Sequence, residues 1–244
     1  MSSAIEIRNI SKKFKSDGKS FYALKNVSLN IEQGEIFALV GPNGSGKTTL
    51  MNIITGVLIP ESGYVKIMGT DVQKDRSIVE RISLVSSGTR FHWALNTGDV
   101  LNFFGRAYGI EPSEREKRIK HLTKFFDLRK ILDRRFDALS TGERVRLVFA
   151  KSLLNEPQVL LMDEPTLGLD PDMALRLRAE IKRINKKFGT TIFLTSHYMK
   201  EIENLSGRVA FIYKGQIKKI DKTKNVGDIE KYFIRTLKKL EAEE

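Results

Sequence analysis

A short glycine-rich segment holds residues of the kinds that bind phosphate groups. It consists of Gly41, Pro42, Asn43, Gly44, Ser45, Gly46, Lys47 and Thr48, and Thr49 follows it. A glycine, four further residues and then glycine, lysine and threonine form the P-loop pattern, whose backbone N–H groups turn inward around phosphates. Lys47 is expected to reach the outer phosphates, and the Thr48 hydroxyl to bind Mg²⁺. The segment therefore predicts a nucleotide site with magnesium.

The residues on either side of this segment support the same interpretation. Residues 35–40 are an apolar run of strand length, and residues 49–54 have a helical pattern. A strand, a glycine loop and a helix in this order are the setting in which a P-loop works. The helix N-terminus adds the positive end of its dipole to the phosphate site.

Two acids follow a second apolar run. Residues 159–162 predict a buried strand, and Asp163 and Glu164 come directly after it. Such a strand delivers its carboxylates to the carboxyl edge of a sheet, where P-loops also open. Asp163 is then placed to hold Mg²⁺, directly or through water, and Glu164 to orient or deprotonate an attacking water. The alternative is an acidic helix cap with Pro165 starting the turn.

Residues 139–143 form a second candidate for anion binding. Ser140 and Glu143 have the spacing of a capping box, and Gly142 lies between them. A bare helix N-terminus beside a serine and a glycine can also hold an anion. The two roles can coexist, because the cap serves the helix until a phosphate oxygen takes over its donors.

Composition restricts the kinds of protein to consider. The chain has 244 residues, of which 41% are hydrophobic and 30% charged, and it has no cysteine. This predicts one large domain, or a domain with a subdomain, without disulfides or cysteine–zinc sites. The N-terminus lacks the regions of a signal peptide, and no apolar run approaches the ~20 residues that span a bilayer. A cytoplasmic location is expected.

The formal net charge of +12 allows nucleic acid or an anionic membrane as a partner. Residues 214–240 contribute nine basic and three acidic side chains to this excess. A solvated lysine-rich surface is the simpler interpretation. Nothing in the sequence resembles a nucleic-acid-binding module, so nucleic acid is not expected as a partner.

Strand and helix patterns alternate along the chain. Strands are predicted at 5–10, 21–31, 64–68, 82–85, 159–162, 190–195 and 208–213, helical patterns dominate 97–155, and an amphipathic helix is predicted at 226–240. Ser113 and Glu116 suggest a capping box after Pro112. Alternating strands and helices predict an α/β fold with a mostly parallel sheet covered on both faces.

In this order the motifs resemble those of the ATP-binding cassette (ABC) ATPases, from about residue 5 to residue 221. Residues 41–48 are similar to Walker A, and residues 159–164 to Walker B with its following glutamate. Residues 139–143 resemble the family signature, leucine-serine-glycine-glycine-glutamine, at three of five positions. Asp170 after Leu169 resembles the D-loop, and His197 after residues 193–196 resembles the switch histidine.

The resemblance implies a fold and a domain organisation. The fold would be a P-loop NTPase core with a mostly parallel sheet, an N-terminal antiparallel β subdomain and an inserted helical subdomain. One ATPase domain would span residues 1–221, with the helical insertion at about 89–155. Residues 222–244 would form a basic amphipathic helix or tail.

The resemblance also implies a mechanism with ATP and Mg²⁺. Two cassettes would pair head to tail, as a homodimer or a heterodimer, so that Ser140 and the Gly142 backbone complete the partner's site. Glu164 would activate water, His197 would contact the γ-phosphate, and Asp170 would couple the two sites. Phe14 resembles the aromatic residue that stacks on adenine, and Tyr22 is the rival.

The sequence departs from the family pattern at two places. Thr141 and Glu143 replace glycine and glutamine in the signature. The family's Q-loop glutamine, which contacts magnesium and water and signals to the transmembrane partner, is absent after residues 82–85. Ser87 lies nearest to that place, with Ser86 as the alternative, and we expect a water to bridge Ser87 to the metal.

The function implied is the ATPase subunit of an ABC transporter, bound peripherally to the cytoplasmic face of the membrane. Separate transmembrane permease subunits would supply the pore and would dock near residues 87–104, where the apolar run 91–95 could be either a contact or subdomain core. Export is favoured, because the signature resembles that of export-type cassettes and no regulatory domain follows Asp221. The alternatives are a soluble ABC ATPase in nucleic-acid, ribosome or iron–sulfur assembly, and a protein that uses ATP as a switch without turnover.

Overall fold

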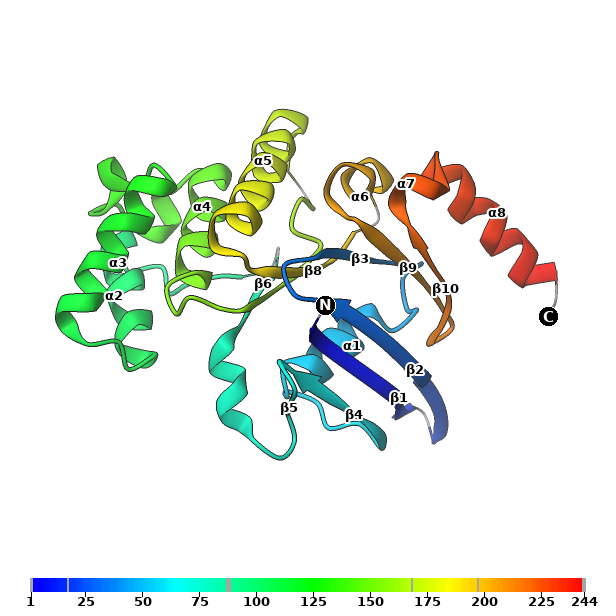
Figure 1. Ribbon diagram of the computed structural model, residues 1–244. Coiled ribbons are helices and arrows are strands. Elements are labelled where there is room, and N and C mark those ends of the chain that lie inside the picture. The colour runs from blue at the N-terminus through cyan, green and yellow to red at the C-terminus, as the bar shows by residue number, and fades with distance from the viewer. Residues whose placement is uncertain (1, 17, 87–88, 168, 197, 243–244) are drawn as a thin grey trace.

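The computed structural model describes residues 2–16, 18–86, 89–167, 169–196 and 198–242. Among these residues the strands form two sheets, with the helices packed around them (Figure 1). The fold is α/β, with an antiparallel N-terminal sheet and a mixed second sheet, as the sequence predicts.

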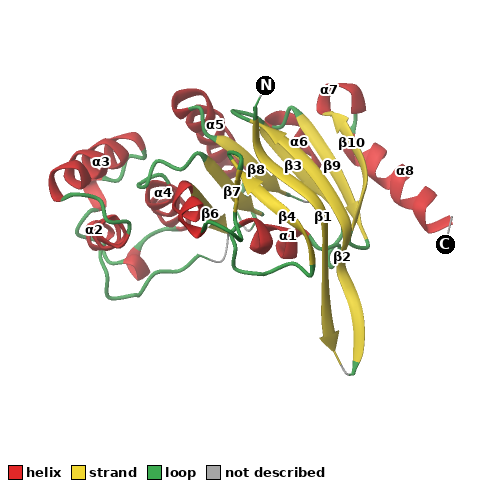
Figure 2. Ribbon diagram, turned by 60° about the horizontal axis from the view of Figure 1, so that its bottom comes forward, coloured by secondary structure: helices red, strands yellow, loops and turns green. Residues whose placement is uncertain are grey.

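The N-terminal sheet is antiparallel and has the strand order β2-β1-β4-β5. Its strands are β1 (Ser3–Ser16), β2 (Lys19–Glu32), β4 (Ser62–Ile67) and β5 (Thr70–Asp71). β1 and β2 are longer than predicted and extend as a hairpin away from the body (Figure 2). Phe14 and Phe21 face each other across the two strands, and the pairing runs on to Ser16 opposite Lys19.

The second sheet has the order β10-β9-β3-β8-β7-β6, in which only β10 is antiparallel to its neighbour among the described strands. Its strands are β3 (Ile36–Val40), β6 (Ile82–Ser86), β7 (Val159–Asp163), β8 (Thr191–Thr195), β9 (Arg208–Tyr213) and β10 (Gln216–Lys222). The parallel strands therefore end at one edge, where β3 meets the glycine loop and β7 ends in Asp163.

Both faces of this sheet are buried, which explains the continuous apolar runs of its strands. Phe37 and Leu39 of β3 pack on one side with the N-terminal sheet and helix α1 (Lys47–Ile54). Ala38 and Val40 pack on the other side with the remaining helices. Alternation of side chains along a strand divides the core into these two clusters.

A helical segment lies at one end of the molecule, before β7 (Figure 2). It contains α2 (Thr97–Ala107), α3 (Pro112–Phe125) and α4 (Thr141–Ser152), with 3₁₀ turns at Arg129–Ile131 and Phe136–Ala138; a third 3₁₀ turn, Arg76–Arg81, precedes β6. The predicted capping box at Ser113 is wrong. Pro112 is already the first helical residue, so Ser113 lies inside the helix, and Glu114 pairs with Arg118 at 2.9 Å.

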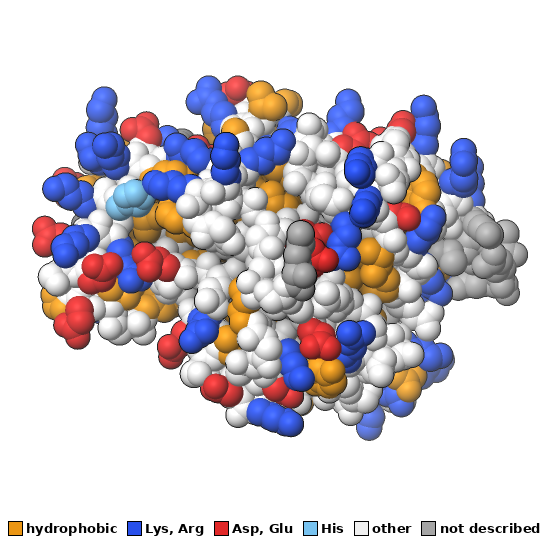
Figure 3. Space-filling model, viewed as in Figure 1, with side chains coloured by type: hydrophobic (Ala, Val, Ile, Leu, Met, Phe, Trp, Pro, Cys, Tyr) orange, Lys and Arg blue, Asp and Glu red, His pale blue; other side chains and the backbone are white. Residues whose placement is uncertain are grey.

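The C-terminal part packs on the sheet opposite α1. It contains α5 (Pro171–Phe188), α6 (Met199–Leu205), α7 (Thr223–Val226) and α8 (Ile229–Ala242). The predicted terminal helix starts later than expected, because Gly227 at φ 68° separates α7 from α8. None of the helices in the described part of the chain has the length and apolar content of a membrane span. On the face shown in Figure 3, Lys and Arg side chains are spread among acidic ones.

Candidate functional site

The glycine loop joins β3 to α1 and leaves the helix N-terminus without a cap from its own side chains. The N-cap residue is Gly46, at φ 103°, and no side chain in the described chain caps this helix. A Cβ at Gly46 would lie 2.5 Å from the Ala23 carbonyl oxygen. The Gly215 N–H donates to the Ser45 carbonyl at 3.1 Å and supports the loop from behind. The Ser45 N–H is used within the loop, where it donates to the Pro42 carbonyl at 3.2 Å, but the backbone donors at the start of α1 are left for a ligand.

Lys47 is 8% exposed and is folded onto the loop. Its Nζ donates to the Gly41 carbonyl at 2.7 Å and to the Pro42 carbonyl at 3.1 Å. Burial lowers the pKa of Lys47, while the negative charges of Glu164 and Asp163 act in the opposite direction. A phosphate taking the place of these carbonyls would compensate the buried ammonium with a full negative charge.

The two residues predicted to hold Mg²⁺ lie next to each other. The Thr48 hydroxyl donates to Asp163 Oδ2 at 3.2 Å, and the Thr195 hydroxyl donates to Asp163 Oδ1 at 2.6 Å. Thr195 stands opposite Asp163 because β7 and β8 are parallel neighbours in register. Oxygen donors beside a phosphate site suit Mg²⁺, which is commonly held by one or two protein ligands, phosphate and water. No cluster of three or more His, Cys, Asp or Glu residues competes for a metal within the described residues.

Glu164 follows Asp163 in a strained position. Its φ is 51°, a left-handed conformation that is uncommon for residues other than glycine. Its backbone N–H lies 3.2 Å from both the carbonyl oxygen and the hydroxyl of Thr195. Strain of this kind persists where surrounding contacts fix the backbone, and it is frequent at functional sites.

These residues line one pocket of about 490 Å³. Its described lining is Phe14, Phe21, Ala23, Asn43, Gly44, Ser45, Gly46, Lys47, Thr48, Thr49, Ser86, Asp163, Glu164 and Leu167. The pocket brings together the P-loop and both acids, although 115 residues separate Thr48 from Asp163 in the sequence.

Of the two aromatic candidates, Phe14 lines the pocket and Tyr22 is not among its described lining residues. Phe21, which the sequence reasoning missed, lies there too, with its ring centroid 6.2 Å from that of Phe14. Phe21 and Ala23 share one face of β2, and Tyr22 points to the other face, where Lys13 Nζ lies 4.6 Å from its ring centroid. Strand alternation could have identified Phe21 once the hairpin register was known.

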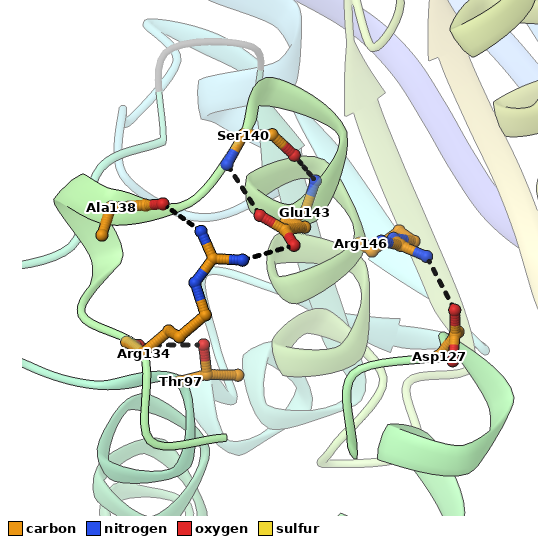
Figure 4. Close-up of polar contacts among 7 residues, drawn as sticks. All are labelled: Thr97, Asp127, Arg134, Ala138, Ser140, Glu143 and Arg146. Atoms are coloured by element: carbon orange, nitrogen blue, oxygen red, sulfur yellow. Dashed lines mark hydrogen bonds and ion pairs between the residues drawn. The ribbon is translucent and has the colours of Figure 1, made fainter. Parts of the chain in front are cut away.

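The predicted capping box at the start of α4 is confirmed (Figure 4). The Ser140 N–H donates to Glu143 Oε2 at 2.8 Å, and the Glu143 N–H donates to Ser140 Oγ at 3.3 Å. Arg134 pairs with Glu143 at 2.8 Å and also donates to the Ala138 carbonyl. The hydrogen bond from the Ser140 backbone lowers the pKa of Glu143. Thr141 is the first helical residue.

Residues 140–143 line a second hollow of about 620 Å³, together with Asp170 and Met173. Asp170 caps α5 by accepting the Met173 N–H at 2.9 Å. A Cβ at Gly142 would lie 2.4 Å from Met173 Cε, so a small residue is required there. The described lining of this hollow shares no residue with that of the P-loop pocket. Within one chain, the two candidate anion sites are therefore separate.

Two predicted site residues, Ser87 and His197, lie outside the described residues. The alternative to Ser87, Ser86, ends β6 opposite Asp163 and lines the P-loop pocket.

The apolar run 91–95 was expected to be either a contact with the permease or part of the subdomain core, and its residues differ in this respect. The ring of Phe91 packs on Phe104 and Phe136, at centroid distances of 5.6 and 5.3 Å, as subdomain core. Trp93 is 60% exposed and stacks on His92.

A sequence profile described as ABC transporter matches residues 24–167. The chain belongs to the ABC transporter family. The ABC transporter ATP-binding protein NatA of Bacillus subtilis strain 168 is 33% identical over 215 residues, which cover 87% of each protein. The taurine import ATP-binding protein TauB of Ruegeria pomeroyi is 35% identical over 85% of this chain and 76% of TauB. The Nod factor export ATP-binding protein I of Burkholderia lata is 33% identical over 87% of this chain and 68% of that protein. This ABC protein is an ATP-binding subunit of a transporter.

Solved structures agree with this assignment. A dimeric ATP-binding cassette in a post-hydrolysis state, bound to ADP and Pi, has a TM-score of 0.77 and 26% identity, over 90% of this chain and 98% of that one. ATP hydrolysis is accordingly the activity of this ABC subunit.

Proposed function

We propose that ATP is bound with Mg²⁺ in the P-loop pocket and is hydrolysed there by water that Glu164 activates. The main support for this proposal is that two distant segments of the chain line one pocket. They contribute Lys47 and Thr48 on one side and Asp163 and Glu164 on the other. Phe14 and Phe21 at its rim would hold the adenine. Residues 1–221 would act as one ATPase domain, with the helical insertion at about 89–155.

Each step rests on groups of the chain itself. When ATP binds, the Lys47 ammonium gives up its hydrogen bonds to the Gly41 and Pro42 carbonyls and bonds the outer phosphate oxygens instead. Its positive charge then partly neutralises the phosphate group that is transferred. Thr48 and Asp163 are the residues that would hold Mg²⁺, whose charge would stabilise the departing phosphate. Glu164 lies one residue beyond Asp163 and accepts the proton of the attacking water. His197 is proposed to contact the γ-phosphate.

The signature residues would complete the site of a second cassette. In the isolated chain Ser140, Thr141, Gly142 and Glu143 line a hollow separate from the P-loop, so a phosphate reaches both sites only across two subunits. Asp170, which lines the same hollow, would couple the paired sites. A head-to-tail dimer, of identical or different cassettes, satisfies this arrangement.

The subunit would dock peripherally on separate transmembrane permeases at the cytoplasmic face of the membrane. The exposure of Trp93, which lines a hollow together with Ser86 at the end of β6, supports it as a contact residue. The direction of transport is left open, because the similar proteins include one named for import and one named for export.

Glu164→Gln tests the proposed hydrolysis. This change keeps the shape of the side chain and removes the base, so turnover should fall about 100-fold or more. The dissociation constant for ATP should stay within about threefold of wild type, and an ATP-dependent dimer should persist in light scattering. Asp172→Asn, an exposed acid of α5 that pairs with Arg176, is the control and should change neither value. Turnover near the wild-type rate in Glu164→Gln would exclude this role.

A further inference from the structure

One carboxylate outside the phosphate site is buried in the protein interior. Glu201 of α6 is 2% exposed, although its helix is rich in polar residues. A buried acid is costly unless hydrogen bonds compensate it. Its surroundings therefore indicate what it does.

A single oxygen of Glu201 accepts two hydrogen bonds from buried hydroxyl groups. Ser196 Oγ donates to Oε2 at 2.5 Å, and Thr166 Oγ1 donates to the same atom at 3.0 Å. Ser196 Oγ also accepts the backbone N–H of Tyr198 at 3.0 Å. The serine hydroxyl therefore links Glu201 to the backbone at Tyr198.

The two donors come from different loops of the sheet edge. Thr166 lies two residues after Glu164, in the loop that leaves β7, and Ser196 lies directly after β8. Glu201 therefore bonds a side chain from each of the two loops. The loops also meet nearer the sheet, where Thr195 contacts Asp163 and Glu164.

We propose that Glu201 is a positioning residue, which fixes the loop after β7 against the loop after β8 and so aligns Glu164 with the segment that carries His197. The proposal rests on the proposed function, because it assumes that these two segments act on one phosphate. Glu201 touches neither ATP nor water in this proposal. It acts only through Thr166 and Ser196.

The geometry indicates that an acceptor oxygen is needed at this position and a charge is not. Oε2 takes both hydrogen bonds, and Oε1 has no partner among the described residues. Burial raises the pKa of Glu201, while the hydrogen bonds from Ser196 and Thr166 and the charge of Arg178 act in the opposite direction. A glutamine could place its carbonyl oxygen at Oε2 and keep both bonds.

The first experiment compares Glu201→Leu with Glu201→Gln. Leucine removes the acceptor, so kcat should fall about tenfold or more, since small misplacements of catalytic groups cost that much. The dissociation constant for ATP should stay within about threefold, because the P-loop is unchanged. Glutamine should retain at least about a third of the wild-type kcat. Equal losses in both variants, or ATP binding that weakens in step with kcat, would overturn the proposal.

A second set of variants keeps the proposal testable if Glu201→Leu does not fold. Thr166→Val keeps the side-chain shape and removes one donor, and it should lower kcat about fivefold at unchanged ATP affinity. Thr166→Val alone serves that case; where Glu201→Leu does fold, adding Thr166→Val to it should cost nothing further, because both changes break the same link. Additive losses in the double variant, or an unchanged kcat in Thr166→Val, would contradict the proposal.

Ser206→Ala is the matched control. Ser206 is a buried serine just after α6, and its hydroxyl donates to the Ile202 carbonyl at 2.9 Å and pairs with Thr223. Its loss should lower the thermal midpoint and leave kcat unchanged. A fall in kcat here would mean that any damage around α6 slows turnover, which removes the case for Glu201. Glu164→Gln tests the proposed hydrolysis separately. A wrong role for Glu164 can therefore be told apart from a wrong role for Glu201 in linking the two loops.

Discussion

The N-termini of α1 and α4 have the same backbone donors but opposite local chemistry. α1 starts at Gly46 with no side-chain cap and no acid in its first turn among the described residues. α4 starts at Ser140 with a complete capping box, and Glu143 is in its first turn. Both termini carry a partial positive charge and unpaired N–H groups. The comparison shows that α1 offers its N–H groups to phosphate directly, whereas at α4 a phosphate would have to take over donors that the capping box already holds.

Removing the Lys47 ammonium from the uncapped N-terminus of α1 should have the largest effect on ATP binding. Lys47→Ala leaves the outer phosphates without a side-chain charge, so ATP affinity should drop about tenfold or more, or about 1.4 kcal/mol. Calorimetry with ATP measures this directly. Lys182→Ala, an exposed lysine of α5, serves as the control and should bind like wild type. Equal affinities for Lys47→Ala and wild type would refute the P-loop assignment.

Blocking the capped N-terminus of α4 should stop hydrolysis in the ATP site of the partner subunit. ATP binding in the P-loop pocket of the altered subunit should be unaffected. Ser140→Arg should therefore bind ATP normally and be nearly inactive alone. If the chain pairs with itself, mixing it with Lys47→Ala should rebuild one working site per dimer. ATPase assays of the mixture against each variant alone check this. No gain in the mixture would show that the sites do not combine across subunits, or that both must be intact.

Removing the cap itself should have a moderate effect. Ser140→Ala deletes the acceptor for the Glu143 N–H, so the free energy of unfolding should fall by about 1 kcal/mol. Asn96→Ala is a matched comparison, because Asn96 and Asp99 form the capping box of α2. Chemical denaturation should give similar losses for both variants. Only Ser140→Ala should also slow hydrolysis, and an equal slowing by Asn96→Ala would count against a phosphate role for Ser140.

The smallest effect is expected for Glu143→Gln, which keeps the capping box and weakens the pair with Arg134. The pKa of Glu143 is lowered in the folded protein, chiefly by the Ser140 backbone hydrogen bond. Its charge therefore stabilises the fold above the unfolded carboxyl pKa of about 4.5. That contribution is lost as the pH falls through the folded pKa. Wild type should be slightly more stable than Glu143→Gln at pH 7, and thermal melts at a series of pH values below 4.5 should show this difference shrinking as the pH falls.

Residues whose roles depend on neighbours in the chain were predictable from the sequence. The P-loop, the strand that ends in Asp163 and Glu164, and the cap at Ser140 each follow from local spacing. The boundaries of the parallel strands of the second sheet were close for the same reason, since runs of buried apolar residues mark them. Chain neighbours also explain the error at Ser113, where the preference of proline for the first helical turn overrode a capping pattern.

Residues whose roles depend on contacts across the fold were not predictable. Phe21 lines the pocket only because β1 and β2 pair in a register that places it opposite Phe14. Glu201 looks like a surface residue within the polar helix α6, yet it is buried against loops from β7 and β8. Thr195 ends an apolar strand, and its contact with Asp163 depends on the alignment of β7 and β8. No single-sequence pattern encodes these pairings.

The place of β3 in the sheet has a consequence for the order in which the protein can fold during synthesis. β3 lies between β8 and β9, and the loop after it is supported by Gly215. β8, β9 and Gly215 are all translated long after β3, since even the first of them, β8, starts at Thr191 and β3 ends at Val40. The helices from Thr97 to Ser152 contact one another and are all translated before β8, so they can form before those partners are made. A nascent chain that ends before β8 would therefore have the capped terminus of α4 in place, while its ATP pocket could not yet assemble.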